Sequence, residues 1–429
     1  MVQLPHFPGF AGGRRCGGCE RSVYRSGRRV RSRRTGLVRV GRRADYALIA
    51  PPRVGPGCGS LSGADRRLLA RAIECGRRGW GRVHPNPMVG ALVVRGDEVL
   101  GEAFHAGYGG PHAEVSALAA VGDARGTTLY CSLEPCSHQG KTPPCTEAIL
   151  AAGVARVVFW AAEPGVEQKG GAEWLRSRGV VVDGPFGKPS DWAAENPVFF
   201  HNAAAGVPYV ALKLAVSMDG RIAPARGRRV WLTGEASRRE VHRLRAGFDA
   251  ILVGTRTWEA DDPMLTARGA VVPRVPPVAV LLDRCGRAST RLRALRSRSG
   301  PHSIVATAPE RAGGLARRLA GCADVVAVPV RDERLDLAVL MEALAARGVR
   351  GLLCEGGGVL AASLLREELV DRLYLFVAPV IVGEGGVPAF PVGQPGERAE
   401  ETLRFKGWKS VIDPSRFGND TLVVLDRVD

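Results

Sequence analysis

The sequence Leu133-Glu-Pro-Cys-Ser-His-Gln-Gly-Lys-Thr-Pro-Pro-Cys145 follows an expected strand over residues 127–133 and enters an expected helix over 146–152. It carries two thiols, Cys136 and Cys145. Upstream, Pro111-His112-Ala113-Glu114 opens another expected helix. One imidazole and two thiols are the three protein ligands of a catalytic Zn²⁺ that keeps its fourth position open for water. We therefore predict that His112, Cys136 and Cys145 bind one zinc ion.

Glu114 is the predicted proton carrier of this site. It lies two residues after His112, close to the metal without binding it. Zinc lowers the pKa of a bound water to about 7. The carboxylate can then take a proton from the water and pass it to a ring nitrogen and a departing amine. The competing interpretation is a core histidine with packed structural cysteines, and the complete set of residues in this order argues against it.

The segments around these motifs predict two α/β units. In residues 62–200 we expect strands over 89–94, 99–104, 127–133, 154–161 and 180–182, with helices over 64–76, 112–121, 146–152 and 172–177. This order predicts one mixed sheet covered by helices. A stretch of small residues at 203–206 suggests a boundary over 197–207. Strands and helices then alternate through residues 207–429, which predicts a second α/β enzyme domain.

The turn Gly356-Gly357-Gly358 joins an expected strand over 351–354 to an expected helix over 359–365. Backbone N–H groups at such a turn can approach an anion, and the N-terminus of a helix favours negative charge. The turn is therefore a candidate phosphate site. The alternative is a plain connection between a strand and a helix.

The zinc motif resembles that of the zinc-dependent nucleobase deaminases, H-x-E…P-C-x-x-C, but its second gap is eight residues long. The inserted residues, together with His84-Pro-Asn-Pro-Met-Val-Gly90, resemble the deaminase half of the bifunctional riboflavin-biosynthesis deaminase/reductases. Four further stretches are similar to the reductase half of that family: residues 212–220, Trp231-Leu-Thr233, residues 254–263 and Glu355-Gly-Gly-Gly358. The resemblance covers about residues 62–429. It implies a cytidine-deaminase-like α/β/α domain followed by a dihydrofolate-reductase-like α/β domain.

This resemblance implies two consecutive reactions. Zinc-dependent hydrolysis would convert a diaminopyrimidinone ribosyl phosphate to the aminouracil ribosyl phosphate, and NADPH would then reduce the ribosyl side chain to ribityl. One rival is a nucleic-acid base deaminase with an accessory domain, and another is a protein with one decayed domain. Two departures bear on the second rival: Arg229 stands where the family commonly has serine, and Glu163-Pro-Gly-Val166 replaces D-P-N-P.

The resemblance also implies the site residues. In the deaminase half, substrate contacts would come from Asn86, His138 and Lys141, although Asn86 can also be read as a turn residue between prolines. In the reductase half, Lys213 would polarise the sugar carbonyl as part of a triad with Asp261 and Glu355, unless it is a surface lysine. The cofactor would contact Ala215, Trp231, Thr257, Asp261, Gly356, Gly357 and Gly358. The substrate would contact Arg245, Leu265, Arg268 and Glu355, with Arg245 alternatively a helix-terminal cation.

The net charge of +17 is concentrated at one end of the chain. Residues 1–60 hold thirteen arginines and two acids, and therefore +11 of the total. This tail is expected to be disordered and reads as a nucleic-acid or phosphate-binding arm, a transit peptide or an extension without function. Its Cys16-x-x-Cys19 pair is weak evidence for metal. No stretch reaches the roughly 20 apolar residues of a membrane helix. We expect a cytoplasmic, or alternatively plastid, homodimer that acts on small molecules without nucleic-acid or membrane partners.

Overall fold

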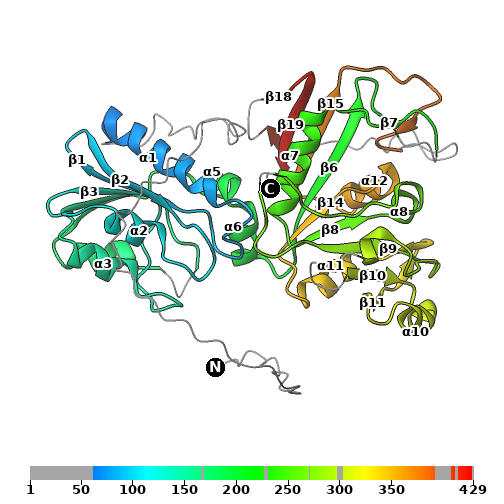
Figure 1. Ribbon diagram of the computed structural model, residues 1–429, viewed down its shortest axis with the longest axis horizontal. Coiled ribbons are helices and arrows are strands. Elements are labelled where there is room, and N and C mark those ends of the chain that lie inside the picture. Colours follow the sequence, from blue (N-terminus) through cyan, green and yellow to red (C-terminus); the bar gives the residue numbers. More distant parts are fainter. Residues whose placement is uncertain are drawn as a thin grey trace, which may run out of the picture. The chain divides into compact units, whose positions relative to one another are not determined.

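The computed structural model describes residues 61–165, 169–226, 230–269, 271–296, 303–391, 407–410 and 414–427 (Figure 1). All of these belong to one compact unit. The predictions made for residues 1–60 and for Arg229 lie outside the described residues. In the part that is described, no helix combines the length and apolar character needed to cross a bilayer.

The first half is built on a five-stranded mixed sheet in the order β2-β1-β3-β4-β5. Its strands are β1 (Gly90–Arg95), β2 (Glu98–Phe104), β3 (Thr128–Leu133), β4 (Arg156–Ala161) and β5 (Val181–Asp183). β1 pairs with β2 and β3 antiparallel, whereas β3, β4 and β5 run parallel. The predicted mixed sheet is therefore confirmed.

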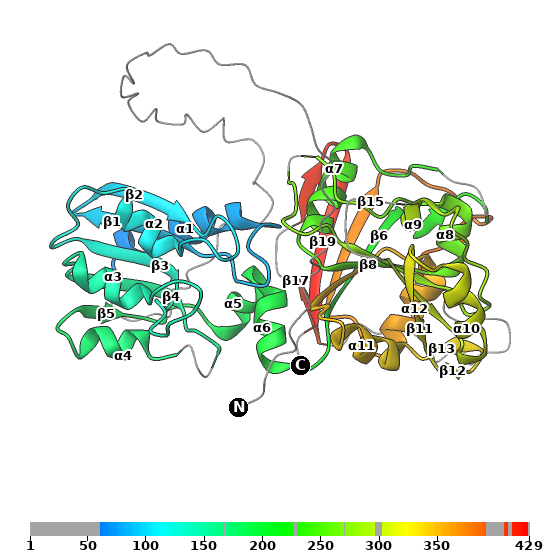
Figure 2. The same cartoon turned by 60° about the horizontal axis from the view of Figure 1, so that its bottom comes forward.

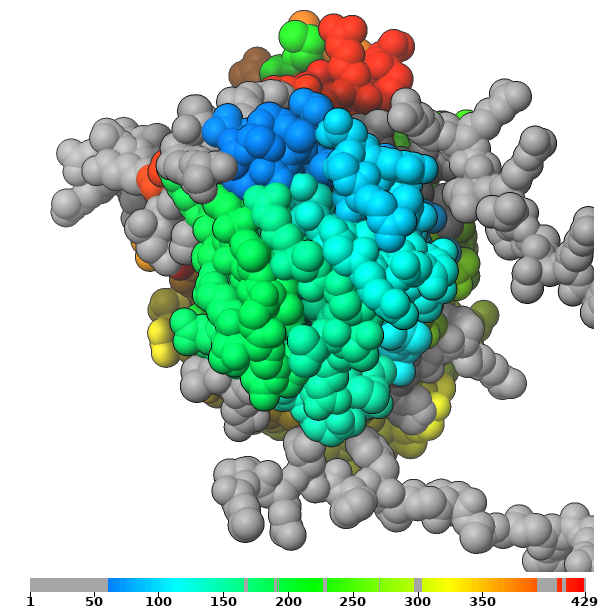
Figure 3. Space-filling model, turned by 90° about the vertical axis from the view of Figure 1, so that its left-hand side faces the viewer, coloured from blue at the N-terminus to red at the C-terminus, as the bar shows by residue number. Residues whose placement is uncertain are grey.

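Helices α1 (Gly63–Gly76), α2 (Ala113–Ala119), α3 (Cys145–Ala151) and α4 (Gly171–Arg176) pack around this sheet. Figure 3 shows them from outside, where the blue, cyan and green residues form one continuous surface. α1 begins at a capping box in which Ser62 and Asp65 bond each other's backbone N–H groups. Asp65 also accepts from Tyr130 Oη at 2.6 Å and Arg156 Nη1 at 2.8 Å. This buried carboxylate thus joins the helix to β3 and β4.

Two further helices, α5 (Pro189–Glu195) and α6 (Pro197–Ala204), follow the first sheet and were not predicted. The stretch predicted as a boundary is helical through Ala204. Pro197 suits the first turn of a helix, and alanines have the highest helix propensity. Val198 packs in the same core cluster as Tyr209 and Phe248 of the second half. Small residues here therefore continue a packed helix instead of forming a linker.

The second half contains a ten-stranded sheet, ordered β11-β10-β9-β8-β14-β6-β15-β19-β17 with β18 paired to β19. The strands from β11 to β15 along this order are parallel, and β19 pairs antiparallel with β15, β17 and β18. Their bounds are β6 (Tyr209–Ser217), β8 (Ala250–Val253), β9 (Val278–Leu282), β10 (Ser303–Thr307), β11 (Ala323–Ala327), β14 (Gly351–Cys354), β15 (Arg372–Ala378), β17 (Trp408–Ser410), β18 (Ser415–Phe417) and β19 (Asp420–Arg427).

Helices cover both faces of this sheet, because successive strand residues point to opposite sides. Leu252 lies in one core cluster with α11 (Leu337–Ala345) and α12 (Gly358–Arg366). Its neighbour Ile251 lies in another with α8 (Thr255–Asp261), α9 (Arg293–Arg296) and α10 (Pro309–Arg318). α7 (Glu235–Ala246) packs through Leu244 against Tyr209 and Leu353, on the side of the sheet away from α11 (Figure 2). Two short ribbons, β7 (Arg221–Ala223) with β16 (Val387–Pro388) and β12 (Val330–Arg331) with β13 (Arg334–Leu335), complete the half.

Candidate active sites

The three predicted zinc ligands meet where α2 and α3 begin. His112 is the N-cap residue of α2, Cys145 opens α3, and Cys136 follows β3. His112 Nδ1 lies 3.2 Å from Cys145 Sγ and 3.5 Å from Cys136 Sγ. All three ligand atoms lie within 4.8 Å of one another. One nitrogen and two sulfurs at these separations fit a single zinc ion, which prefers such ligands in tetrahedral geometry.

Glu114 lies beside this cluster in the first turn of α2 and is 3% exposed. Burial raises the pKa of its carboxyl group to about 7, although the nearby His112 opposes the shift. Its Oε2 atom is buried without a hydrogen-bond partner among the described residues. A hydrogen bond with Cys145 is the main cause that lowers the pKa of Cys136, to about 4. The arrangement therefore combines a thiolate ligand with a carboxylate that can exchange protons near neutral pH.

Asn86 is linked to the metal cluster through His105, a residue that the sequence analysis did not identify. His105 is 2% exposed, and its Nδ1 lies 3.0 Å from the Pro111 carbonyl oxygen. Because a carbonyl oxygen only accepts, Nδ1 carries the proton and Nε2 accepts from Asn86 Nδ2 at 3.2 Å. The His105 ring packs edge-on against His112, with centroids 5.5 Å apart. This bond leaves the amide oxygen of Asn86 available to a ligand.

The other two predicted substrate residues lie on the loop between the cysteines. Lys141 is exposed, and its Nζ sits 4.0 Å from the centroid of the Tyr108 ring. His138 is partly buried, with no partner for Nδ1 among the described residues. Lys141 lowers the pKa of the Tyr108 hydroxyl, mainly by hydrogen bonding to it. Tyr108 is a second residue that the motifs did not point to, since no local pattern marks it.

In the second half, Glu355 forms the centre of a buried charge cluster. It immediately follows β14, and both of its oxygens accept from Arg245 of α7, at 2.5 Å from Nε and 3.0 Å from Nη2. Lys213 of β6 places its Nζ 3.9 Å from Glu355 Oε2. Burial raises the pKa of Glu355, but Arg245 and Lys213 outweigh it, so the net shift is downward. Burial also lowers the pKa of Lys213. A partly neutralised ammonium group in this setting can hydrogen-bond a carbonyl oxygen.

The glycine turn is adjacent to this cluster at the carboxyl end of β14. Gly357 caps α12, and its N–H donates to Thr257 Oγ1 of α8 at 3.0 Å. A Cβ on Gly358 would stand 2.5 Å from the Pro388 carbonyl oxygen. Gly358 is therefore required by close backbone packing, and the Gly357 amide is already engaged. Two of the three glycines thus have structural partners in addition to any cofactor.

The remaining predicted residues of this half differ in their surroundings. Ala215 lies on β6, and Asp261 ends α8. Trp231 is 62% exposed, with the Arg238 guanidinium 5.3 Å above its ring. Arg268 is exposed. Leu265 adopts a left-handed backbone conformation, with φ of 52°, and buries its side chain in the core cluster of Trp258. Only the main chain of Leu265 remains for a substrate.

Two family models match the chain in this order. The cytidine and deoxycytidylate deaminase zinc-binding region covers residues 62–161, and the RibD C-terminal domain covers residues 208–414. These ranges contain the two clusters described above. The deaminase model includes His112, Cys136 and Cys145, and the reductase model includes Lys213, Arg245 and Glu355.

Proteins of the same organisation resemble nearly the whole chain. The riboflavin biosynthesis protein RibD of Aquifex aeolicus is 35% identical over 367 residues, which is 85% of this chain and 98% of that protein. The RibD of Escherichia coli is 36% identical over 74% of this chain and 89% of its own length. The solved structure of Acinetobacter baumannii RibD superposes with a TM-score of 0.72 at 33% identity, covering 85% of this chain and 99% of that one.

A further solved structure, from Thermotoga maritima, carries both activities in its title, diaminohydroxyphosphoribosylaminopyrimidine deaminase and 5-amino-6-(5-phosphoribosylamino)uracil reductase. It superposes with a TM-score of 0.71 at 30% identity. The predicted fold class is confirmed, since a deaminase domain precedes a reductase domain and both are mixed α/β. The predicted zinc and NADPH follow from the same two domains. The chain therefore belongs to the RibD family and is a bifunctional enzyme of riboflavin biosynthesis, a deaminase joined to a reductase.

Proposed function

We propose that residues 62–200 carry out the deamination, with His112, Cys136 and Cys145 holding zinc and Glu114 moving protons. The observation that carries this proposal is the convergence of three ligand atoms within 4.8 Å beside a buried carboxylate. Zinc, when bound, supplies a water of lowered pKa. Glu114 accepts a proton from the attacking water, delivers one to the pyrimidine ring nitrogen and one to the amino group that leaves as ammonia.

The amino-pyrimidine ring is oriented by Asn86, and the ribose phosphate lies toward the loop that holds His138 and Lys141. The free amide oxygen of Asn86 can accept from an amino or ring N–H group of the substrate. Lys141 is a mobile point charge suited to a phosphate. Its contact with the Tyr108 face keeps the ammonium group near the site without an acidic partner in the described contacts.

For the reduction, carried by residues 207–429, we assign Lys213 to the carbonyl oxygen of the opened ribose. Hydride transfer requires the nicotinamide and this carbon to be held together, with the oxygen polarised as it gains charge. NADPH would lie along Ala215, Trp231, Thr257, Asp261 and the turn Gly356–Gly358. Substrate would lie against Glu355, Arg268 and the Leu265 main chain.

The geometry supports a changed role for Arg245. Its Nε and Nη2 atoms both donate to Glu355, and Nη1 donates to the Thr266 carbonyl oxygen at 3.0 Å. A guanidinium group committed in this way is poorly placed to bind the substrate phosphate. We therefore assign Arg245 to the orientation of Glu355 and leave Arg268 as the cation for the phosphate.

One experiment tests both assignments to the chain as a whole. The purified protein is incubated with the diaminopyrimidinone ribosyl phosphate, with and without NADPH, and the products are identified by mass spectrometry. We expect ammonia and the aminouracil without NADPH, and the ribityl product with oxidation of NADPH. Ammonia release without any NADPH oxidation would show that the reductase half is inactive, and the converse with deaminated substrate would show the same for the deaminase.

We also propose a cytoplasmic homodimer without nucleic-acid or membrane partners. The small-molecule substrates of the family support this proposal. Sedimentation velocity at micromolar concentration would measure the assembly state, and a single species at the 45.6 kDa mass of one chain would contradict a dimer. Fluorescence imaging of the tagged chain would distinguish cytoplasm from plastid.

A further inference from the structure

The segment from Trp80 to Met88 presents Asn86 to the deaminase site. It lies between the short 3-10 helix η1 (Arg77–Gly79) and strand β1, and it has no regular secondary structure. Few of its own hydrogen bonds hold its shape, such as that from the Asn86 N–H to the Val83 carbonyl oxygen at 2.9 Å. The position of Asn86 must therefore depend on what the segment packs against.

At its start, this segment is anchored on α7 of the reductase half. Trp80 Nε1 donates to the Arg243 carbonyl oxygen at 2.7 Å, and the Arg243 guanidinium lies 5.0 Å from the indole ring. A Cβ on Gly247 would stand 2.1 Å from a Trp80 ring carbon. The absence of a side chain at Gly247 thus makes the space that the indole fills.

Its middle is held by two polar contacts from the same half. Arg274 donates from its backbone N to the Gly81 carbonyl oxygen at 2.9 Å and from Nη2 to the His84 carbonyl oxygen at 3.1 Å. His84 Nε2 lies 2.7 Å from Asp249 Oδ1. The other oxygen of Asp249 accepts from the backbone N–H groups of Arg350 and Gly351 at the start of β14. Asp249 is thereby fixed to the central sheet and offers His84 a rigid partner.

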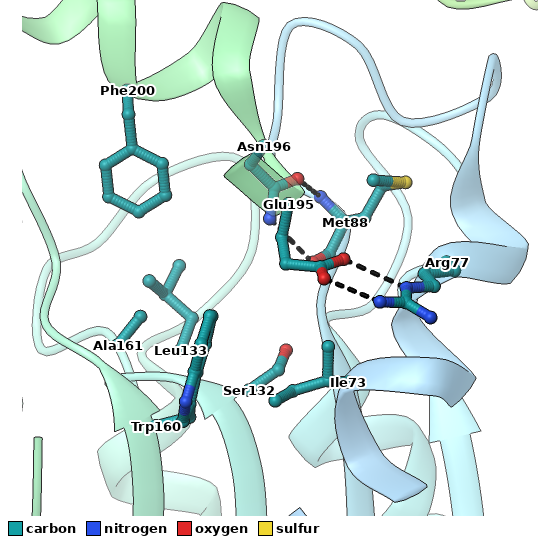
Figure 4. A pocket seen from close by; sticks show the side chains of 10 residues that line it. All are labelled: Ile73, Arg77, Met88, Ser132, Leu133, Trp160, Ala161, Glu195, Asn196 and Phe200. Atoms are coloured by element: carbon teal, nitrogen blue, oxygen red, sulfur yellow. Dashed lines mark hydrogen bonds and ion pairs between the residues drawn. The ribbon is translucent and has the colours of Figure 1, made fainter. Parts of the chain in front are cut away.

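The end of the segment is held by the helices that follow the first sheet (Figure 4). Asn196 Oδ1 accepts from the Met88 N–H at 2.7 Å, and its Nδ2 donates to the Met88 carbonyl oxygen at 3.4 Å. Beside it, Glu195 forms a buried two-point pair with Arg77, at 2.9 and 2.6 Å. With both ends held, the single side-chain contact in the middle that points at the reductase sheet is that of His84, among the contacts described here.

We propose that His84 is a positioning residue of the deaminase, and that its bond to Asp249 makes the reductase half part of the support of the deaminase substrate site. The bond lies two residues from Asn86, whose proposed role in substrate binding this inference assumes. Binding groups must be held within about 0.5 Å of their productive place, and a misplacement of about 1 Å can reduce the rate of catalysis about 100-fold. Removing a single contact of several should have a smaller effect, expressed mainly in KM.

The test compares His84→Ala with His84→Gln in the full-length enzyme. We expect His84→Ala to raise the deaminase KM about three- to tenfold, with unchanged zinc content and unchanged NADPH oxidation on deaminated substrate. Gln carries an N–H donor that can reach Asp249, so His84→Gln should restore most of the KM. His201 is the matched control, because it forms a similarly exposed pair with Asp371, 3.8 Å apart, away from the segment. His201→Ala should leave the deaminase KM unchanged.

Two further variants keep the inference falsifiable. Arg274→Ala removes the side-chain bond to the His84 carbonyl and should raise the same KM. The double variant His84→Ala/Asn86→Ala should show the KM of Asn86→Ala alone, because the two residues act through one contact. An unchanged KM in both His84→Ala and Arg274→Ala, or a loss of zinc and of both activities together, would overturn the inference. If Asn86→Ala leaves KM unchanged while His84→Ala raises it, the proposed role of Asn86 is the part that fails.

Discussion

Replacing Glu114 with Gln is the sharpest test of the deaminase mechanism. Gln has nearly the same shape as Glu but cannot exchange protons near neutral pH. Glu114 is 3% exposed, and its Oε2 lacks a partner among the described residues, so the substitution breaks no hydrogen bond at that atom. We therefore expect a midpoint of thermal unfolding within about 2–4 °C of the original, the equivalent of about 1 kcal/mol for a domain of this size.

The expected loss of activity is large because Glu114 serves several proton transfers in one turnover. One positioned acid or base contributes about 10²–10⁴-fold to a rate. We expect kcat for ammonia release to fall by about 10³–10⁴, which corresponds to about 4–5.5 kcal/mol of activation free energy. Zinc should remain near one ion per chain, because Glu114 is not among the three clustered ligands.

The assay measures ammonia release, zinc content and NADPH oxidation on the same preparations. Glu147→Gln is the matched control, since Glu147 lies in the first turn of α3 but is exposed. It should change ammonia release by less than about twofold. Reduction of deaminated substrate should be unaffected in both variants. Ammonia release within tenfold of the original enzyme in Glu114→Gln, with zinc retained, would refute the assigned role.

Three further outcomes are expected. Removing zinc with a chelator should abolish ammonia release and leave NADPH oxidation on deaminated substrate intact, and joint loss would contradict separate centres. Lys213→Met should lower the reductase kcat about 10²–10³-fold with little change in NADPH affinity measured by fluorescence, and a kcat within threefold would contradict its role. Burial raises the pKa of Asp65, but hydrogen bonds from Arg156 and Tyr130 outweigh it and hold that pKa well below its usual range. This stabilisation is present above pH about 4 and declines as pH falls below it. Asp65→Asn should remove that acid-dependent part and cost about 1.5–3 kcal/mol of unfolding free energy by denaturant titration.

Much of the deaminase site could be predicted because its members are set by local order. His112 and Glu114 are two residues apart at the start of one helix, and Cys136 and Cys145 follow one strand and enter the next helix. Such spacing limits where the side chains can point. The alternation of strands and helices likewise predicted both α/β halves, and the chief error was helix α6, whose small residues suggested a boundary.

The contacts that organise the sites come from distant parts of the chain and have no local pattern. Arg245 reaches Glu355 across 110 residues, and Trp80 reaches Arg243 across 163. His105 attracts no attention in the sequence, yet its ring joins Asn86 to the zinc ligand His112.

The sequence by itself therefore determined the chemistry, namely the metal ligands, the proton carrier and the order of two α/β domains. Hydrophobic periodicity and motif spacing act over a few residues, which is the range of a strand, a turn or a helix. Only the tertiary structure decided which groups are already paired, as Arg245 is with Glu355, and which are buried and free, as Glu114 Oε2 is. That distinction depends on how remote segments pack, because burial and a neighbouring charge set the state of each group.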